Sequence, residues 1–175
     1  MTQHGIPKPQ YYAMCMLSRI QGKLLLRQEN CIATLTAAGI IQILFFHYVH
    51  LDQMYSSMDT SGVLPRRRNT CFEPADDLSV ACTLKCPSGS YRLVKELLST
   101  EQGSAFDAWV RLGADEVLND REISYLKQIC VPKMSTEQIQ VQDSITLHLT
   151  LKPHEVAFWE LTPRSPLDSD PVQSP

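Results

Sequence analysis

Residues 31–49, CIATLTAAGIIQILFFHYV, decide the fold class of this chain. Two candidate strands, residues 31–36 and 40–49, flank the short Ala-Ala-Gly stretch at 37–39, and this arrangement predicts a β-hairpin. The second strand is apolar at positions of both parities, so its side chains are expected to be buried on both faces of a sheet. The fold is therefore expected to be built around a central β-strand.

Further strand patterns extend this prediction to most of the chain. Five more stretches read as strands, most of them with alternating apolar and polar residues: residues 23–27, 78–86, 90–98, 145–151 and 156–161. Turn residues at 87–89 predict that the second and third of these form a hairpin, and the turn at 152–154 predicts the same for the last two. We therefore predict a mainly β chain, an antiparallel β-sandwich of seven or eight strands with an N-terminal helix and a two-helix insertion.

The N-terminal helix is predicted from helical spacing. Pro7 and Pro9 open the pattern and Gly22 ends it. Its apolar stripe consists of Ala13, Met16, Leu17 and Ile20. This stripe has to pack on a sheet or on a part of the protein outside this chain.

Two short helices are predicted within residues 103–130, as an insertion into the sandwich. Ser104 and Asn119 each precede an acidic residue by three positions, an approximate capping box that satisfies the free amides of a first helical turn. Gly113 and Pro132 end the two helices.

The first inserted helix carries the candidate interface residues, which are Phe106, Trp109 and Arg111. The spacing of Phe106 and Trp109 is that of one apolar helix face. Such a face is typical of a core, and stacking on a sugar ring is the alternative.

The expected organisation has three parts: a helix at 1–22, a sandwich domain at 23–163 and a tail at 164–175. The tail is rich in Pro, Ser and Asp and is predicted to be disordered.

Residues 51–77 match no regular element. They are longer than connections in compact domains usually are, so they form either a mobile surface loop or a segment ordered by a partner. They contain Arg66, Arg67 and Arg68, which we interpret as part of a solvated loop, with binding of a phosphate or an acidic partner as the alternative.

Composition excludes several classes of function. The formal net charge is -3, which argues against a nucleic-acid partner. No apolar run approaches the ~20 residues of a membrane-spanning helix. The six cysteines are widely dispersed, so we expect reduced thiols in a cytoplasmic protein.

No motif predicts a catalytic residue, a metal ligand or a cofactor site. A glycine-rich phosphate loop, a Gly-x-Ser-x-Gly elbow and a His-Glu-x-x-His zinc helix are all missing from the sequence. His47 and His50 are separated by three positions, which on a strand directs them to opposite faces.

Three stretches, in this order and spacing, resemble the C-terminal part of glycoside hydrolase family 39 β-xylosidases. The first contains Lys8-Pro9, Tyr11-Tyr12-Ala13 and Leu17, the second is Gly103-Ser104-Ala105-Phe106-Asp107-Ala108-Trp109 with Gly113, and the third contains Pro153-His154-Glu155-Val156 and Glu160-Leu161. The resemblance extends from about residue 8 to residue 163.

This resemblance implies that residues 1–22 are similar to the last helix of a (β/α)8 barrel, and that the remainder is the accessory β-sandwich. Enzymes of this family hydrolyse xylosides with retention, using two glutamates on barrel strands. Both lie upstream of the matched region, and the Asn-Glu pair that marks the acid/base is missing here. No catalytic residue is therefore carried over.

The leading hypothesis is a non-catalytic fragment, the accessory domain of a β-xylosidase-like hydrolase, inactive alone. Its expected partner is the catalytic barrel or a neighbour in a homo-oligomer, and xylo-oligosaccharide is a candidate ligand. The alternatives are a free-standing carbohydrate-binding or protein-interaction module. A regulator with a glycosidase-like part is a third, although no helix-turn-helix pattern supports it.

Overall fold

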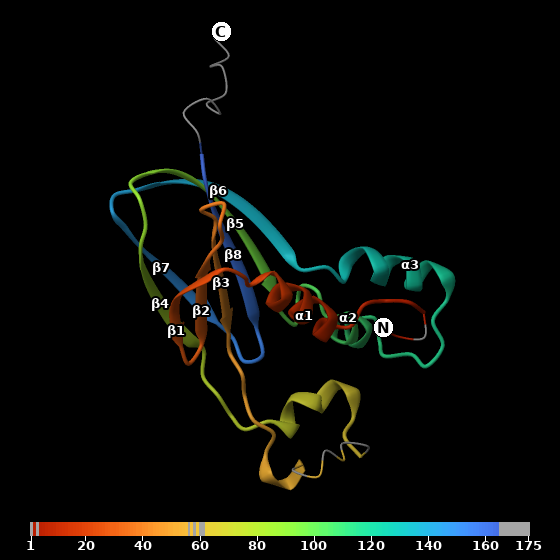
Figure 1. The fold of residues 1–175 in the computed structure, drawn as a ribbon. Coiled ribbons are helices and arrows are strands. Elements are labelled where there is room, and N and C mark those ends of the chain that lie inside the picture. The colour runs from red at the N-terminus through yellow and green to blue at the C-terminus, as the bar shows by residue number, and fades with distance from the viewer. Residues whose placement is uncertain (1, 3, 56, 58, 60–61, 165–175) are drawn as a thin grey trace.

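A computed structural model describes residues 2, 4–55, 57, 59 and 62–164. It confirms a mainly β chain with an N-terminal helix and a two-helix insertion (Figure 1). The elements are α1 (Pro9–Arg19), β1 (Lys23–Gln28), β2 (Cys31–Leu35), β3 (Ile41–Phe46), the 3-10 helices η1 (Gln53–Tyr55) and η2 (Pro65–Cys71), β4 (Leu78–Lys85), β5 (Gly89–Leu98), α2 (Ala105–Arg111), α3 (Asp120–Ile129), β6 (Lys133–Val141), β7 (Ser144–Leu151) and β8 (Val156–Pro163).

The strands form two antiparallel sheets of unequal size. The larger has the order β1-β2-β3-β8-β5-β6, and the smaller consists of β4 and β7. Buried side chains from both sheets meet in one hydrophobic core, which includes Cys31, Phe45, Cys82, Leu93 and Trp159. This core accounts for the sandwich, because each sheet buries one apolar face against the other.

The predicted central strand is confirmed. β3 lies between β2 and β8, and five of its six residues are buried. Gln42 is the polar residue among the five buried residues of β3. Its amide nitrogen donates to Glu160 Oε2 (3.2 Å) and its oxygen accepts from the backbone N–H of Gln21 (3.3 Å). The predicted hairpin of β2 and β3 is also confirmed, although β3 ends at Phe46 rather than at residue 49.

The other two predicted hairpins are wrong. β4 pairs with β7, whereas β5 pairs with β6 and β8, so the turns that follow β4 and β7 cross from one sheet to the other. Alternating polarity determines which face of a strand is buried, and it leaves the pairing partner undetermined.

The sequence prediction also missed β6. Five of its first seven residues lack an apolar side chain, and the strand is exposed from Lys133 to Gln138, so it carries no alternation to detect.

Helix α1 covers the face of the large sheet opposite β4 and β7. Met16 is buried there against Leu44, Leu98 and Phe158. The stripe expected from the sequence is thus correct for Ala13, Met16 and Ile20, and it packs within this chain, but Leu17 points away and is 45% exposed.

Gly22 allows the turn from α1 into β1. Its φ is +93°, and a Cβ atom there would lie 2.3 Å from the carbonyl oxygen of Leu35. A glycine is required at this position.

The insertion has the predicted caps. The Ser104 hydroxyl accepts from the Asp107 amide at the start of α2, and Asn119 and Glu122 form a complete capping box at the start of α3. The two helices pack on each other and on the N-terminal segment through a small core: Ile6, Ala105, Ala108, Leu126 and Cys130.

Residues 51–77 contain more structure than predicted. They include η1 and η2, and a bridge between Leu51 and Phe72 closes the segment at its base. The segment lies beside the insertion, at one end of the sandwich (Figure 1).

The division into 1–22, 23–163 and 164–175 stays a prediction. Residues 165–175, and with them nearly all of the predicted disordered tail, lie outside the described residues. In the described part of the chain, no helix has the length and apolar character needed to span a membrane.

Candidate functional site

A cleft opens at the end of the sandwich where η2, the β7–β8 turn and α2 approach one another. Its volume is about 1080 Å³. Its wall combines aromatic, basic, acidic and amide side chains, among them Arg68, Asn69, Phe72, Glu73, Phe106, Lys152, His154 and Glu155. Such a mixture of ring faces and hydrogen-bonding groups suits a polar organic ligand or a protein partner.

The β7–β8 turn supplies one wall of this cleft. Glu155 is buried, and its carboxylate accepts from the backbone N–H of Lys152 (2.9 Å), which closes the turn. His154 has a φ of +67° and packs its ring against Phe72, with 4.2 Å between the ring centroids. Partial desolvation, together with the positive charges of Arg68 and His47, lowers the pKa of His154. The imidazole is therefore neutral at pH 7.

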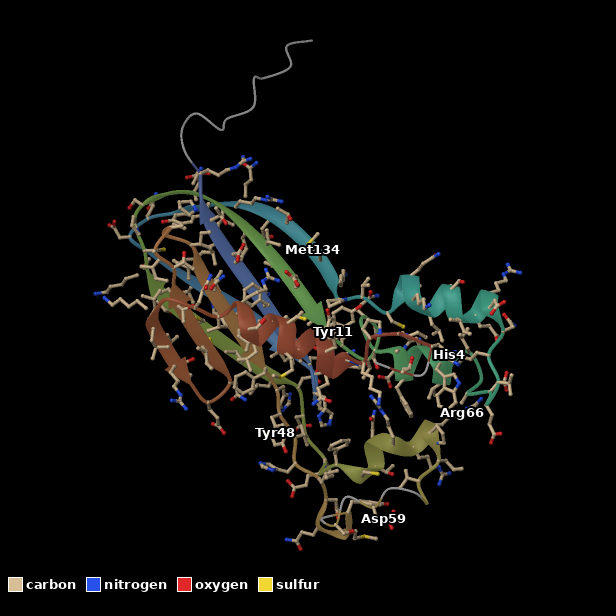
Figure 2. The ribbon with its side chains drawn as sticks, turned by 45° about the vertical axis from the view of Figure 1, so that its right-hand side comes forward. His4, Tyr11, Tyr48, Asp59, Arg66 and Met134 are labelled. Carbon is tan, nitrogen blue, oxygen red and sulfur yellow. The ribbon has the colours of Figure 1, made fainter. Side chains whose placement is uncertain are left out.

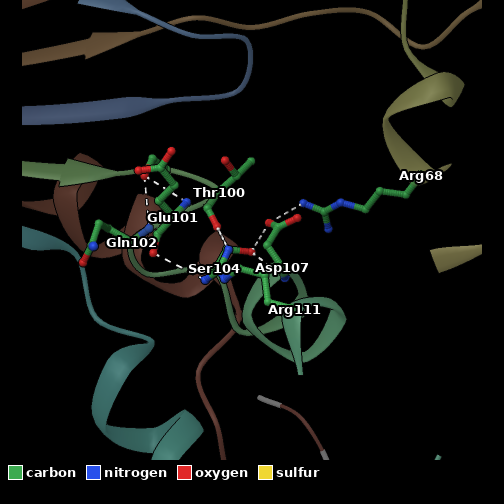
Figure 3. Close-up of polar contacts among 8 residues, drawn as sticks. Arg68, Thr100, Glu101, Gln102, Ser104, Asp107 and Arg111 are labelled. Atoms are coloured by element: carbon green, nitrogen blue, oxygen red, sulfur yellow. Dashed lines mark hydrogen bonds and ion pairs between the residues drawn. The ribbon is translucent and has the colours of Figure 1, made fainter. Parts of the chain in front are cut away.

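Arg68 links the η2 segment to the insertion. Its guanidinium forms an ion pair with Asp107 (2.9 Å) and stacks 4.4 Å above the Phe106 ring, while Asp107 also accepts from the Ser104 hydroxyl (Figure 3). Arg68 Nε is buried and has no hydrogen-bond partner within the described residues. The interpretation of the arginine triplet as solvated thus holds for Arg66 and Arg67, which are exposed, but is wrong for Arg68.

A second, smaller groove of about 580 Å³ lies on the other side of Phe106. Phe106 and Trp109 meet edge to face at 5.5 Å, and both line this groove. Trp109 Nε1 donates to the Asp115 carbonyl (2.8 Å), which fixes the indole against the chain. The groove floor is apolar and includes Ile6, Leu118 and Leu126.

The structure separates the third candidate interface residue from the other two. Arg111 is exposed and donates to the Thr100 carbonyl (2.8 Å), and so ties α2 to the loop after β5 (Figure 3). Phe106 and Trp109 are half-buried, between the exposure expected of an interface and the full burial of a core. The interface role of Phe106, Trp109 and Arg111 stays a prediction.

A third feature is the outer face of α1, which we define by Tyr11, Met14 and Leu17. These side chains are 48%, 57% and 45% exposed. They follow one another at three-residue spacing, so they form an apolar strip on the exposed part of the helix surface; Figure 2 labels the first of them, Tyr11.

The two histidines after β3 do not converge. His47 Nδ1 lies 3.3 Å from the Leu151 carbonyl oxygen, whereas the His50 ring contacts the Tyr48 ring. Among the residues that the structure describes, no group of three His, Cys, Asp or Glu side chains is arranged to hold a metal ion. The absence of catalytic and cofactor-binding residues stays a prediction.

The sequence profile of glycosyl hydrolases family 39 matches residues 1–145. The chain belongs to this family. The structure is similar to that of a monomeric β-xylosidase from Caulobacter crescentus CB15, with 20% sequence identity and a TM-score of 0.71 over 93% of this chain. It is also similar to the GH39 enzyme from Xanthomonas axonopodis pv. citri, with 17% identity and a TM-score of 0.72 over 91% of this chain.

This chain spans only about a third of those enzymes, 32% of the first and 31% of the second. It is also 21% identical over 149 residues to an uncharacterized HTH-type transcriptional regulator of Staphylococcus aureus, of which it covers 18%. The resemblance noted in the sequence to the C-terminal region of the family is thereby confirmed.

Proposed function

We propose that this chain is the non-catalytic β-sandwich part of a β-xylosidase-like glycoside hydrolase, and that it supports a catalytic (β/α)8 barrel. The observation that carries this proposal is the two-sided character of α1. Met16 and its neighbours are buried on the sheet, while Tyr11, Met14 and Leu17 form an exposed strip on the other side. A helix that is apolar on more than one side is typical of a buried element.

Burial of the exposed strip against a partner would contribute substantially to the free energy of binding. Full burial of one such side chain stabilises by about 1.5–3 kcal/mol, and each of the three is roughly half exposed, so complete coverage contributes about 3 kcal/mol. In this proposal the covering surface is the barrel, for which α1 serves as the last helix. The parent reaction is retaining hydrolysis of xylosides, and its two glutamates belong to the barrel.

The first test is activity. The purified chain is expected to release no nitrophenol from a nitrophenyl β-xyloside above a heat-treated control. Release that disappears on mutation of an acidic residue of this chain would refute the non-catalytic role.

The second test is docking. The barrel portion of the Caulobacter enzyme, produced without the third that this chain matches, serves as the probe. We expect this chain to co-purify with that barrel and to raise its soluble yield, and Leu17→Lys to abolish both effects. Leu24→Lys is the matched control, because Leu24 is also exposed but lies on β1. Equal loss with both variants would contradict docking through α1.

A second candidate function is carbohydrate binding, favoured by the cleft with its Phe72 and Phe106 rings and its amide and carboxylate groups. Calorimetric titration with xylo-oligosaccharides distinguishes the two functions. Saturable heat that Phe72→Ala removes supports a binding module, and no heat supports the scaffold.

Two further aspects belong to this proposal. The six unpaired thiols support a reducing, cytoplasmic location. The Staphylococcus regulator carries a region similar to this chain within a protein of another named class, which agrees with a structural module rather than a catalytic one.

A further inference from the structure

The outer strand β6 leaves one edge of the large sheet open. It pairs with β5 in an unbroken register from Lys133 opposite Leu97 to Val141 opposite Gly89. No described residue forms a strand on its other side. In Figure 1, β6 starts near the end of α3 and runs away from it along the outside of the sheet, and Figure 2 places Met134 on this strand. Its side chains are almost all exposed; Ile139 is half-buried and Val141 buried.

The opposite edge of the same sheet is protected, and this contrast is informative. β1 has a register shift between Leu24 and Leu26, and it carries Lys23 and Arg27. Bulges and cations are the usual means by which edge strands avoid pairing with other chains. β6 has no bulge, proline or glycine over nine residues and carries one positive and one negative side chain. It retains the pairing capacity that β1 has lost.

From this we infer that β6 is a self-association edge, on which the β6 strand of a second copy pairs antiparallel about a two-fold axis at Gln138. In an antiparallel strand, about every second residue directs its N–H and C=O away from the existing partner. The two six-stranded sheets then become one continuous sheet across the axis.

The register follows from charge and from overlap. With the axis at Gln138, residues 135–141 of the two copies face one another, so seven of the nine residues of β6 are paired. An axis at Glu137 would instead place two carboxylates directly opposite, which is destabilising. An axis nearer Lys133 would direct the second strand toward α3, which ends at Ile129.

The axis residue permits a test that is specific for this register, because Gln138 faces its own copy. Gln138→Glu and Gln138→Lys each place like charges opposite one another, and each is expected to weaken dimerisation by about five-fold or more. An equimolar mixture of the two variants places opposite charges across the axis and is expected to restore the dimer.

The measurement is sedimentation equilibrium of the full chain from about 1 to about 300 µM, with far-UV circular dichroism to verify folding of each variant. The expected result is a concentration-dependent mass rising from 19.8 kDa toward twice that value. Thr136→Glu is the matched control, because Thr136 is also exposed on β6 but faces Gln140 of the second copy rather than itself. It is expected to weaken the dimer less than Gln138→Glu does.

Three results would overturn the inference. The chain could remain a monomer throughout the concentration range. The dimer could respond to Leu17→Lys and not to the Gln138 variants, which would assign self-association to α1. The mixed variants could fail to restore the dimer, which would exclude this axis.

Discussion

Shortening Met16 to alanine is expected to destabilise the chain strongly, and the same change at Met14 is expected to have little effect. The two methionines lie two residues apart on α1. Met16 is 1% exposed and packs on Leu44, Leu98 and Phe158, whereas Met14 is 57% exposed. Both substitutions change the intrinsic helix propensity by the same amount, so the difference between them isolates the contact with the sheet.

The magnitude follows from the buried volume. Met16→Ala removes three buried heavy atoms and leaves a cavity between the helix and a six-stranded sheet that is too rigid to close it. Truncations of this kind cost about 2–5 kcal/mol, and we expect about 3 kcal/mol. In a domain of this size that corresponds to a decrease of roughly 6–12 °C in melting temperature. Met14→Ala is expected to change stability by less than about 0.5 kcal/mol.

The assay is urea unfolding of both variants, followed by circular dichroism at 222 nm. The free energy of unfolding has to fall with urea concentration at the same slope in both variants, because a changed slope indicates a changed denatured state. Equal destabilisation by both changes, or a larger effect at Met14, would refute the reasoning. The second outcome would mean that α1 is held by its outer face, through self-association, rather than by the sheet.

Three further predictions concern thiols, pH and the turn at Gly22. In the native chain, Cys15 alone of the six cysteines is exposed, so one thiol is expected to react rapidly with Ellman's reagent and six after unfolding. The pKa of His154 is lowered in the folded state, so the unfolded chain binds the proton more readily. The stability of the fold should therefore decrease as the pH falls below about 6.5 toward the folded pKa. His154→Asn should weaken this pH dependence of the melting temperature. Gly22→Ala is expected to cost about 2 kcal/mol or more because of its positive φ and the clash with a backbone carbonyl, whereas Gly62→Ala, with open space around it, should be close to neutral in thermal unfolding.

The sequence predicted those parts of the fold that depend on residues close together in the chain. The apolar run of β3 requires burial on two faces, and Ser104 and Asn119 are caps because their side chains satisfy amides only a few residues away. Pairing between distant strands has no such local cause. β4 and β5 are separated by a short turn typical of a hairpin, and they nevertheless belong to different sheets.

The candidate site was predictable only in part, for a related reason. Phe106 and Trp109 were recognised from helical spacing, but the cleft beside them depends on the η2 segment, whose contact with α2 joins Arg68 to Asp107 across 39 positions. An arginine within a polar, irregular stretch carries no local sign of such a partner. Likewise, the helical period identified the buried side of α1 but assigned Leu17 to it, because Leu17 follows the half-buried Ala13 by four positions and lies at the boundary of the stripe.

The ring of Phe106 borders both the cleft and the smaller groove, and Arg68 lines both as well. The cleft and the groove therefore share one wall, which consists of the Phe106 ring and the Arg68 guanidinium stacked on it. A molecule that pushes this wall from one side changes the volume available on the other. By thermodynamic linkage, any effect that a ligand in the cleft has on binding in the groove is matched by an equal effect in the reverse direction.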